Sequence, residues 1–349
     1  MLTTEMTKRG VTYIGYRCNC DCEICYYKFK PKYWKTLKEI KTDLIRQAKY
    51  YNLEHTDITG GEATIHPNII EILKFCKTLN IKPTIITNGL VIRKEMDELV
   101  DDWLFSIHGV KADHNKIIGK DTFDIVIKNI DKIKKPFRLN CVITKYNYKR
   151  FEEYAMWIIK QKKKPTEVNF INFNPFGEWA SQEQIDFLAN PNDVGTYIKK
   201  AIDILEENNI IVNVRYLPHC FAKGFEKNVV GFSQVWADNK EWNWAHQLNL
   251  NVNVVNDKQF GYGCGRNTAV NNSCQLPECR ECAWEFICDG VLMSYLKHFR
   301  DLKLSSIKGE KIFDPLYFQK ERGEDRKVEP PPKISSKNGF PLPSSSKPK

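Results

Sequence analysis

The sequence lacks any apolar run long enough to cross a membrane. No stretch of its 349 residues approaches the ~20 consecutive apolar residues that a transmembrane helix needs. The segment from Met1 to Glu5 also lacks the basic-then-apolar pattern of a secretory signal. We therefore expect a cytoplasmic protein with no membrane partner. Its 12 cysteines are then reduced thiols, available for metal or cluster binding rather than for disulfides.

The chain has no acidic excess and no internal repeat. Its 53 Lys and Arg residues against 43 Asp and Glu residues give a net charge of +10. A basic surface can attract nucleic acid, a nucleotide or an acidic peptide. The lysines are spread along the sequence, however, which favours a solvated surface over a binding patch. The length suggests about two domains.

Three cysteines stand close together near the N-terminus: Cys18, Cys22 and Cys25, in a C-x3-C-x2-C spacing. Three thiols cannot all pair in disulfides, because one is always left over. Cysteine thiolates are, however, the usual ligands of [4Fe–4S] clusters. Three protein ligands would leave the fourth iron open to a small molecule. Zinc also takes closely spaced cysteines, so a zinc knuckle is the alternative for this stretch alone. Cys20, inside the motif, is interpreted as a bystander.

This spacing resembles that of the radical S-adenosylmethionine (radical SAM) superfamily, in which the open iron binds the amino and carboxylate groups of SAM. The resemblance implies that the reduced cluster passes an electron to SAM. Methionine and a 5′-deoxyadenosyl radical result, and the radical takes a hydrogen atom from the substrate. The sequence departs from the usual pattern at Ile24, where an aromatic residue is common. We expect Ile24 to pack on the adenine.

Residues 1–215 alternate short strand-like runs with amphipathic helices, a pattern typical of a parallel α/β sheet. This pattern alone does not distinguish a partial barrel from a flat sheet, but the superfamily resemblance implies a partial (β/α)6 TIM-type barrel. In barrels the chemistry lies at the carboxyl ends of the strands. The predicted strands are 11–15, 55–59, 82–87, 104–108, 138–144 and 167–173, with 210–215 as a further candidate.

Polar residues at these strand ends form the predicted SAM site. Gly60-Gly61-Glu62 resembles the superfamily's GGE motif, which receives the SAM ammonium, and glycine allows close backbone approach to a ligand. Ser106, Thr87 and Asn88 are placed to hydrogen-bond the ribose hydroxyls. Asn140 is a candidate for the SAM carboxylate or ribose. Each of these residues could instead be a turn or cap residue.

From residue 216 onward the helical periodicity fades and cysteines return. Cys279, Cys282 and Cys288 follow a C-x2-C-x5-C pattern that resembles the SPASM or twitch auxiliary-cluster domains of radical SAM enzymes. No cysteine follows Cys288, so we expect one auxiliary [4Fe–4S] cluster. Cys264 is the preferred fourth ligand and Cys274 is its alternate. A structural zinc site is the alternative reading of this spacing.

Two residues have no single predicted role. Cys220 stands where the barrel meets the second domain and could ligate a cluster, donate a hydrogen atom to a product radical or only pack. His108 could face the substrate, but a satisfied surface histidine is the preferred interpretation. The predicted domains are a radical SAM partial barrel, an auxiliary-cluster domain, a C-terminal extension and a disordered tail rich in Pro, Ser and Lys. Their boundaries are 1–215, 216–300, 301–324 and 325–349.

The resemblances imply a radical SAM enzyme that works with a reductant such as flavodoxin or ferredoxin. Only 17 residues precede Cys18, too few for the recognition domain that peptide-modifying relatives often carry. We therefore expect a small polar metabolite, such as a nucleotide or sugar derivative, as the substrate, with a ribosomal peptide or protein as the alternative. A zinc-ribbon nucleic-acid-binding module is the alternative of another class. Acidic residues beside the cysteines disfavour phosphate binding, so no specific nucleic acid is expected.

Overall fold

The computed structural model describes residues 8–25, 27–28, 32–51, 53–175, 182–231, 234, 240, 273–314 and 316–319. The predicted tail at 325–349 and the candidate ligand Cys264 lie outside these residues. Across the described ranges, no helix combines the length and apolarity needed to cross a membrane.

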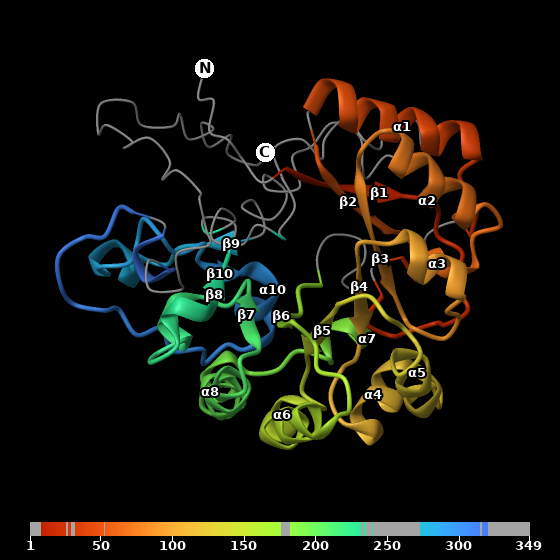
Figure 1. Ribbon diagram of the computed structural model, residues 1–349. Helices are drawn as coiled ribbons and strands as arrows, with labels where there is room; N and C mark the ends of the chain where they lie inside the picture. Colours follow the sequence, from red (N-terminus) through yellow and green to blue (C-terminus); the bar gives the residue numbers. More distant parts are fainter. Residues whose placement is uncertain are drawn as a thin grey trace.

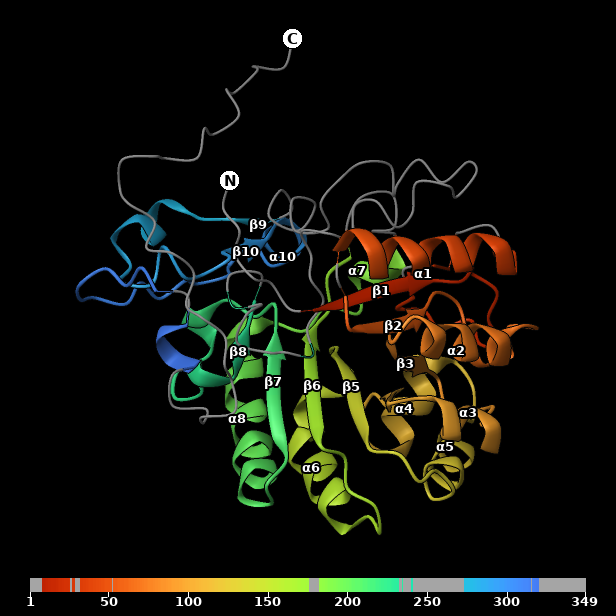
Figure 2. The same ribbon diagram turned by 45° about the horizontal axis from the view of Figure 1, so that its top comes forward.

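Eight strands form one parallel sheet in which each strand pairs with its neighbours in chain order. The sheet curls into a half-barrel, and Figure 2 shows the strands turning from β1 to β8. This confirms the predicted partial-barrel fold and the candidate strand at 210–215, which is β7, and adds β8. The strands are β1 (Arg9–Tyr13), β2 (His55–Thr59), β3 (Lys82–Thr87), β4 (Asp102–Ser106), β5 (Phe137–Ile143), β6 (Glu167–Asn172), β7 (Ile211–Arg215) and β8 (Val229–Val230).

Helices cover the outer side of the sheet (Figure 1). The side chains between helices and sheet are apolar and fully buried, among them Ile58, Ile85 and Trp103, and Cys76 and Cys141 belong to the same core. The helices are α1 (Leu37–Tyr51), α2 (Ile69–Thr78), α3 (Lys94–Leu99), α4 (Lys111–Ile118), α5 (Phe123–Ile130), α6 (Phe151–Lys160), α7 (Gln182–Ile185) and α8 (Pro191–Glu207).

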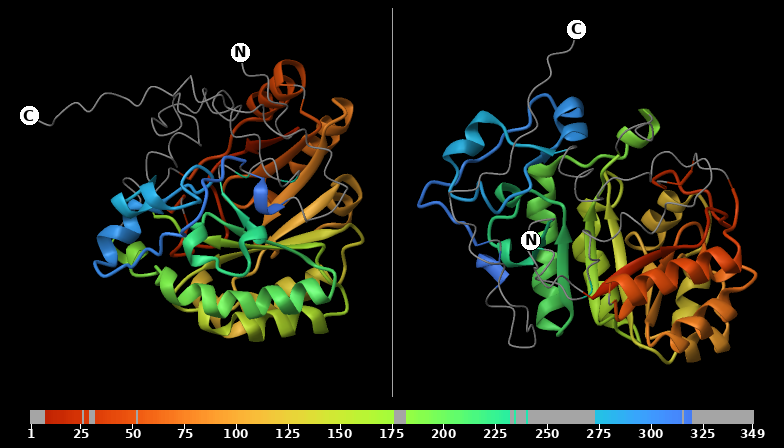
Figure 3. Two further views of the ribbon diagram at one scale, coloured as in Figure 1. Left: turned by 90° about the vertical axis from the view of Figure 1, so that its left-hand side faces the viewer. Right: turned by 90° about the horizontal axis from the view of Figure 1, so that it is seen from above.

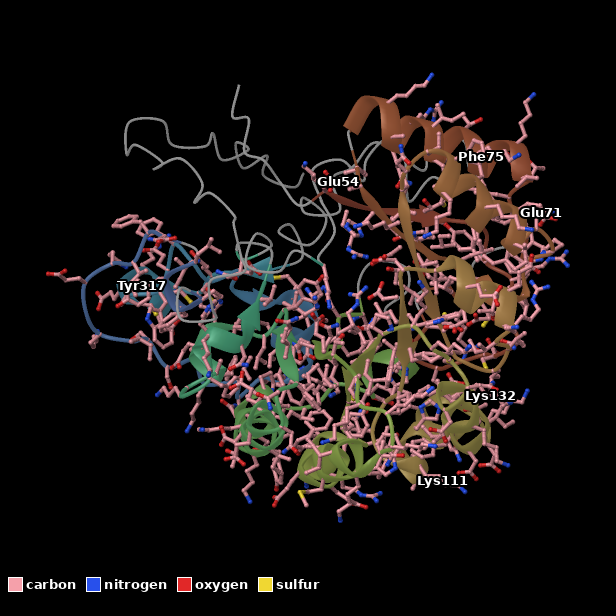
Figure 4. All side chains as sticks on the ribbon, in the orientation of Figure 1. Glu54, Glu71, Phe75, Lys111, Lys132 and Tyr317 are labelled. Carbon is pink, nitrogen blue, oxygen red and sulfur yellow. The ribbon has the colours of Figure 1, made fainter. Side chains whose placement is uncertain are left out.

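The solvent side of these helices is charged. Glu71 on α2, Lys111 at the start of α4 and Lys132 after α5 are exposed and point away from the sheet (Figure 4). This arrangement agrees with the prediction that the lysines form a solvated surface.

The inner side of the sheet carries a buried network of charges near the start of the strands. Successive side chains of a strand point to opposite faces, so Asp57 and Asp102 face away from the helix layer that buries Ile58 and Trp103. Arg9 lies 2.5 Å from Asp57, and Arg138 lies 2.6 Å from Asp102 and 3.9 Å from Asp57. Breaking such a buried pair costs about 3–5 kcal/mol, so this end of the half-barrel is held firmly. The predicted site residues lie at the opposite edge of the sheet, at the carboxyl ends of the strands.

The C-terminal segment packs against the β7–β8 edge of the sheet, on the side away from α1 and α2 (Figure 3). The Tyr295 hydroxyl lies 2.8 Å from the Asn172 side-chain oxygen at the end of β6. The Gln319 side chain donates a 2.7 Å hydrogen bond to the Val229 carbonyl. β8, at Val229–Val230, pairs with Val214 and Arg215 of β7, so the sheet includes residues beyond 215, the predicted end of the barrel. The segment contains β9 (Ser273–Cys274), β10 (Val291–Leu292) and α10 (Met293–His298).

Candidate active site

The three N-terminal cysteines lie on the loop that follows β1. Their side chains are partly exposed and none is in a disulfide. The backbone N–H of Cys20 donates to the Cys18 sulfur at 3.4 Å, and that of Tyr27 donates to the Cys25 sulfur at 3.3 Å. Hydrogen bonds to sulfur are among the features that tune iron–sulfur clusters. Three accessible thiols on one loop therefore fit the donor set that a cluster with one open iron requires.

Gly60 and Gly61 hold the loop after β2 directly against this cysteine loop. The Gly61 N–H donates to the Gly15 carbonyl and the Glu62 N–H to the Arg17 carbonyl, both at 2.8 Å. A Cβ on Gly60 would lie 2.1 Å from the Gly15 oxygen, and one on Gly61 would lie 2.0 Å from the Arg17 oxygen. Both positions need glycine because the two backbones touch. The GGE segment and the cysteine loop are thus one packed unit.

The Glu62 carboxylate is buried and accepts four hydrogen bonds from the chain itself. One oxygen accepts from the Thr64 N–H at 3.0 Å and from the Thr64 and Thr87 hydroxyls at 2.7 Å. The other oxygen accepts from the Asn88 N–H at 2.7 Å. Burial raises the pKa of Glu62, although these donors oppose the rise. The side chain joins the ends of β2 and β3, and its predicted role as an acceptor for the SAM ammonium stays a prediction.

Replacing Glu62 with Gln is expected to weaken SAM binding and to lower the free energy of unfolding by about 1–3 kcal/mol, because the amide NH2 would face a donor that the carboxylate now satisfies. Calorimetric titration with SAM and urea denaturation measure the two effects. Glu71→Gln, on the exposed face of α2, is the matched control and should change neither. Unaltered SAM affinity in Glu62→Gln would remove the carboxylate from the SAM site.

Thr87 and Asn88 are also engaged within the protein. The Thr87 hydroxyl accepts from the Gly89 N–H at 2.9 Å in addition to its bond to Glu62. The Asn88 amide donates to the Asn19 side-chain oxygen at 2.7 Å and lies 3.5 Å from the Cys20 sulfur. Asn88 thus supports the cysteine loop directly, and Thr87 holds the Glu62 carboxylate, roles that their positions in the sequence did not reveal. Their predicted contacts with the ribose stay predictions.

Ser106 and Asn140 are placed differently, because their side chains are partly exposed on the inner face of the sheet. They stand opposite each other in the β4–β5 register. Within the described ranges neither side chain makes a hydrogen bond, so both are available to a ligand. The same row continues through Asn169 and Asn213, which are buried and joined by a 3.1 Å hydrogen bond. Asn169 also accepts from Arg215 at 3.0 Å.

Two further residues contact the cysteine loop or its core. The Ile24 side chain is buried in the main hydrophobic core, so only a small part of it remains for the predicted adenine contact. Gln184, on α7, donates to the Glu23 carbonyl at 3.2 Å and to the Cys25 carbonyl at 3.3 Å. Sequence reasoning missed Gln184, since these partners are about 160 residues away and no local pattern marks such a contact.

His108 is buried, which corrects the expectation of a surface histidine. The Nδ1 atom of the His108 ring accepts from the Val142 backbone N–H at 3.2 Å. The backbone N–H of His108 donates to Nδ1 of the His114 ring, also at 3.2 Å. Burial lowers the pKa of His108 to about 3 and that of His114 to about 4. Both rings are therefore neutral acceptors that brace the strand end carrying Ser106.

The buried rings of His108 and His114 predict that the free energy of unfolding falls in acid. Unfolded histidine has a pKa near 6.5, so below that pH the unfolded chain binds protons that the folded chain does not. The free energy of unfolding should fall as pH drops from 6.5 towards 4, by up to ~1.4 kcal/mol per pH unit for each histidine. Urea denaturation across this range measures the slope. His114→Asn should make it shallower, while His298→Asn, at an exposed position, should not. Equal slopes in both variants would contradict the assignment.

The C-terminal cysteines lie apart from the first loop. Cys279, Cys282 and Cys288 line one cavity, and Cys220 lines it with them. The backbone of Cys274 pairs with Val291 in the β9–β10 ladder. The side chain of Cys274, like the whole of Cys264, lies outside the described part of the chain.

Residues 12–158 match the family model of the radical SAM superfamily, a span that contains the cysteine loop and Gly60-Gly61-Glu62. Residues 12–158 therefore form a radical SAM domain. The chain is an enzyme of the radical SAM type; proteins with this domain use a [4Fe–4S] cluster and SAM, and the thiols of Cys18, Cys22 and Cys25 fit that cluster. This result disfavours the zinc-ribbon alternative.

Two curated relatives and one solved structure illustrate the similarity. An S-adenosylmethionine-dependent nucleotide dehydratase from Flammeovirga pacifica is 28% identical over 149 residues, covering 37% of this radical SAM chain and 51% of the relative. A probable GTP 3′,8-cyclase from Saccharolobus solfataricus is 27% identical over 201 residues, covering 54% and 63%. The chain thus spans between half and two thirds of these relatives.

The solved structure is that of Streptococcus suis SuiB bound to S-adenosylmethionine. It aligns with a TM-score of 0.50 at 21% identity, covering 66% of this chain and 52% of SuiB. At this identity the likeness concerns the fold alone, and it agrees with the radical SAM half-barrel described above.

Proposed function

We propose that this protein cleaves SAM at a cluster held by Cys18, Cys22 and Cys25 and abstracts a hydrogen atom from a small polar metabolite, in the first place a nucleotide. The main support is the packed unit in which three accessible thiols are held against Gly60 and Gly61 at the carboxyl edge of the sheet. When bound, the cluster supplies the electron that cleaves SAM reductively to a 5′-deoxyadenosyl radical.

In this proposal the chain's own residues bind and position the two small molecules. Gly60, Gly61 and Glu62 form the wall beside the cysteine loop that receives the methionine part of SAM. Ser106 and Asn140 offer hydrogen bonds to the adenosyl part, because both side chains reach the inner face without a partner among the described residues. Positioning matters because hydrogen-atom transfer requires the reacting carbon to be held at short range.

The nucleotide assignment has two supports. The relatives named above are, by their names, a nucleotide dehydratase and a probable GTP cyclase. The inner face beyond Asn140 is also polar: Asn169, Asn213 and Arg215 are buried there and hydrogen-bonded through Asn169, which favours a polar ligand over an apolar one. A peptide is the alternative substrate proposed from the sequence, and the experiment below tests it as well.

The proposal includes one auxiliary [4Fe–4S] cluster in the C-terminal segment and a one-electron donor of the flavodoxin or ferredoxin type. The test begins with iron and acid-labile sulfide per chain on anaerobically prepared protein, followed by SAM and dithionite and an assay for 5′-deoxyadenosine. About eight irons per chain indicate two four-iron clusters, and about four indicate one. Zinc without SAM cleavage would overturn the proposal.

The substrate is tested by hydrogen transfer. Perdeuterated nucleoside triphosphates, nucleoside monophosphates, nucleotide sugars and a mixture of deuterated short peptides are added separately. The true substrate should raise the rate of 5′-deoxyadenosine formation and transfer deuterium into it. Transfer from a nucleotide supports the proposal. Transfer from a peptide alone would replace it with the peptide alternative.

A further inference from the structure

Four cysteines from two distant parts of the chain line one cavity between the barrel and the C-terminal segment. Cys279, Cys282 and Cys288 come from the cysteine-rich motif. Cys220 comes from the short 3-10 helix His219–Phe221, which follows β7. None of the four is in a disulfide. The C-x2-C-x5-C motif by itself supplies three ligands, and a fully protein-ligated [4Fe–4S] cluster takes four.

The turn that bears Cys220 is fixed on both sides. On the barrel side, a Cβ on Gly195 of α8 would lie 2.4 Å from the Phe221 carbonyl oxygen, so the helix and the turn are in direct contact. On the other side, the buried His219 ring packs 6.2 Å from the Trp284 ring and 5.9 Å from the Phe318 ring. Cys220 is therefore presented to the cavity by a rigid turn, rather than by a loop that happens to pass near it.

The cavity also offers backbone donors to the sulfurs. The Gly290 N–H donates to the Cys288 sulfur and the Ile307 N–H donates to the Cys282 sulfur, both at 3.4 Å. Hydrogen bonds to thiolate sulfurs help to set the potential of an iron–sulfur cluster. The N-terminal cysteine loop has the same kind of donors at two of its three thiols.

The arrangement suits a cluster better than zinc. Structural zinc draws its ligands to a single ion at about 2.3 Å from each sulfur. A four-iron cluster spreads its thiolates over a larger body, which agrees with four sulfurs lining the walls of one cavity.

We propose that Cys220 is the fourth ligand of the auxiliary [4Fe–4S] cluster, together with Cys279, Cys282 and Cys288. This inference rests on the proposed function, and it replaces Cys264, the fourth ligand preferred from the sequence, with Cys220. With four thiolates the cluster has no open iron, so it transfers electrons or stabilises the structure and does not bind substrate directly. Because Cys220 follows the barrel strand β7 and the other three ligands belong to the C-terminal segment, the cluster would also link the two parts.

The experiment compares Cys220→Ala with Cys264→Ala and Cys274→Ala in the anaerobically reconstituted full chain, using iron content and the EPR spectrum of the reduced protein. Cys220→Ala is expected to lose the auxiliary signal and about half of the iron, or to show a [3Fe–4S] signal after oxidation. Cys264→Ala and Cys274→Ala are expected to keep the wild-type iron content. Full iron and an unchanged spectrum in Cys220→Ala would overturn the inference.

Two controls separate this result from misfolding and from failure of the proposed function. Cys220→Asp offers an oxygen ligand at the same position and should keep iron but shift the EPR signal, which a merely structural cysteine would not do. SAM cleavage at the N-terminal cluster should persist in Cys220→Ala, which shows that the barrel is folded. If the wild-type protein holds only about four irons and still cleaves SAM, the auxiliary cluster is absent and this inference fails while the proposed SAM cleavage stands; zinc without SAM cleavage means that the proposed function itself fails.

Discussion

Replacing Cys18, Cys22 and Cys25 together with alanine is expected to abolish SAM cleavage, lowering 5′-deoxyadenosine formation by at least ~10³-fold. The reason is that, in the proposed function, SAM is cleaved only at the cluster with an open iron, and these three thiols are its proposed ligands. Iron per chain should fall by about half, because the C-terminal cysteines lie in a separate cavity and keep their own cluster. Anaerobic iron analysis and chromatographic assay of 5′-deoxyadenosine measure both effects.

Cys20→Ala is the matched control for the triple variant. Cys20 is in the same loop and its sulfur lies 3.5 Å from the Asn88 amide, but it falls outside the C-x3-C-x2-C spacing. It should therefore keep its iron and most of its activity. Cleavage that survives in the triple variant, or that disappears equally in Cys20→Ala, would mean that the motif has been assigned wrongly.

The second large effect is expected from Gly61→Ala. The added methyl group would lie 2.0 Å from the Arg17 carbonyl oxygen and 2.7 Å from the Tyr16 carbonyl carbon, both backbone atoms of the cysteine loop. Neither atom can move away as a flexible side chain would, so the two loops must separate. Overpacking costs typically 1–3 kcal/mol and occasionally more. At the upper end this corresponds to a ~100-fold loss of SAM affinity.

SAM affinity is measured by calorimetry and iron retention by analysis after gel filtration. Gly119→Asn is the control, because nothing lies within 4 Å of its Cβ position and Asn tolerates the positive φ found there. This variant should bind SAM like the wild type. If Gly61→Ala binds SAM normally, the contact between the two loops does not support the site.

The fold was predictable from the sequence wherever the pattern is local and repeated. The strand at 55–59 was predicted at its observed bounds, because the helical pattern before it stops at Tyr51 and Gly60 and Gly61 follow it directly. The first strand was predicted at 11–15 and lies at Arg9–Tyr13 instead. Ile14 and Gly15 leave the ladder to pair with the segment around Trp34, a contact that local sequence does not announce. β8, only two residues long, was not predicted for the same reason.

The site shows the same limit. The three N-terminal cysteines could be recognised because their spacing is itself the signal. The partners of Glu62 could not, since Thr87 and Asn88 reach it only through the pairing of β2 with β3. No local pattern shows that Cys220 lines a cavity with cysteines that follow it by some 60 residues. Nearness along the chain favoured Cys264 instead.

The hydrogen bonds from Gln184 to the cysteine loop have a consequence for the order in which the protein matures. Glu23 and Cys25 are synthesised early, but the amide that holds their carbonyls belongs to α7, which follows the sixth strand. A nascent chain that ends before α7 has the three thiols without this anchor. Iron and sulfide would thus be inserted most effectively after the ribosome has completed most of the barrel. C-terminal truncations that remove α7 should contain less iron per chain, although every N-terminal ligand is intact.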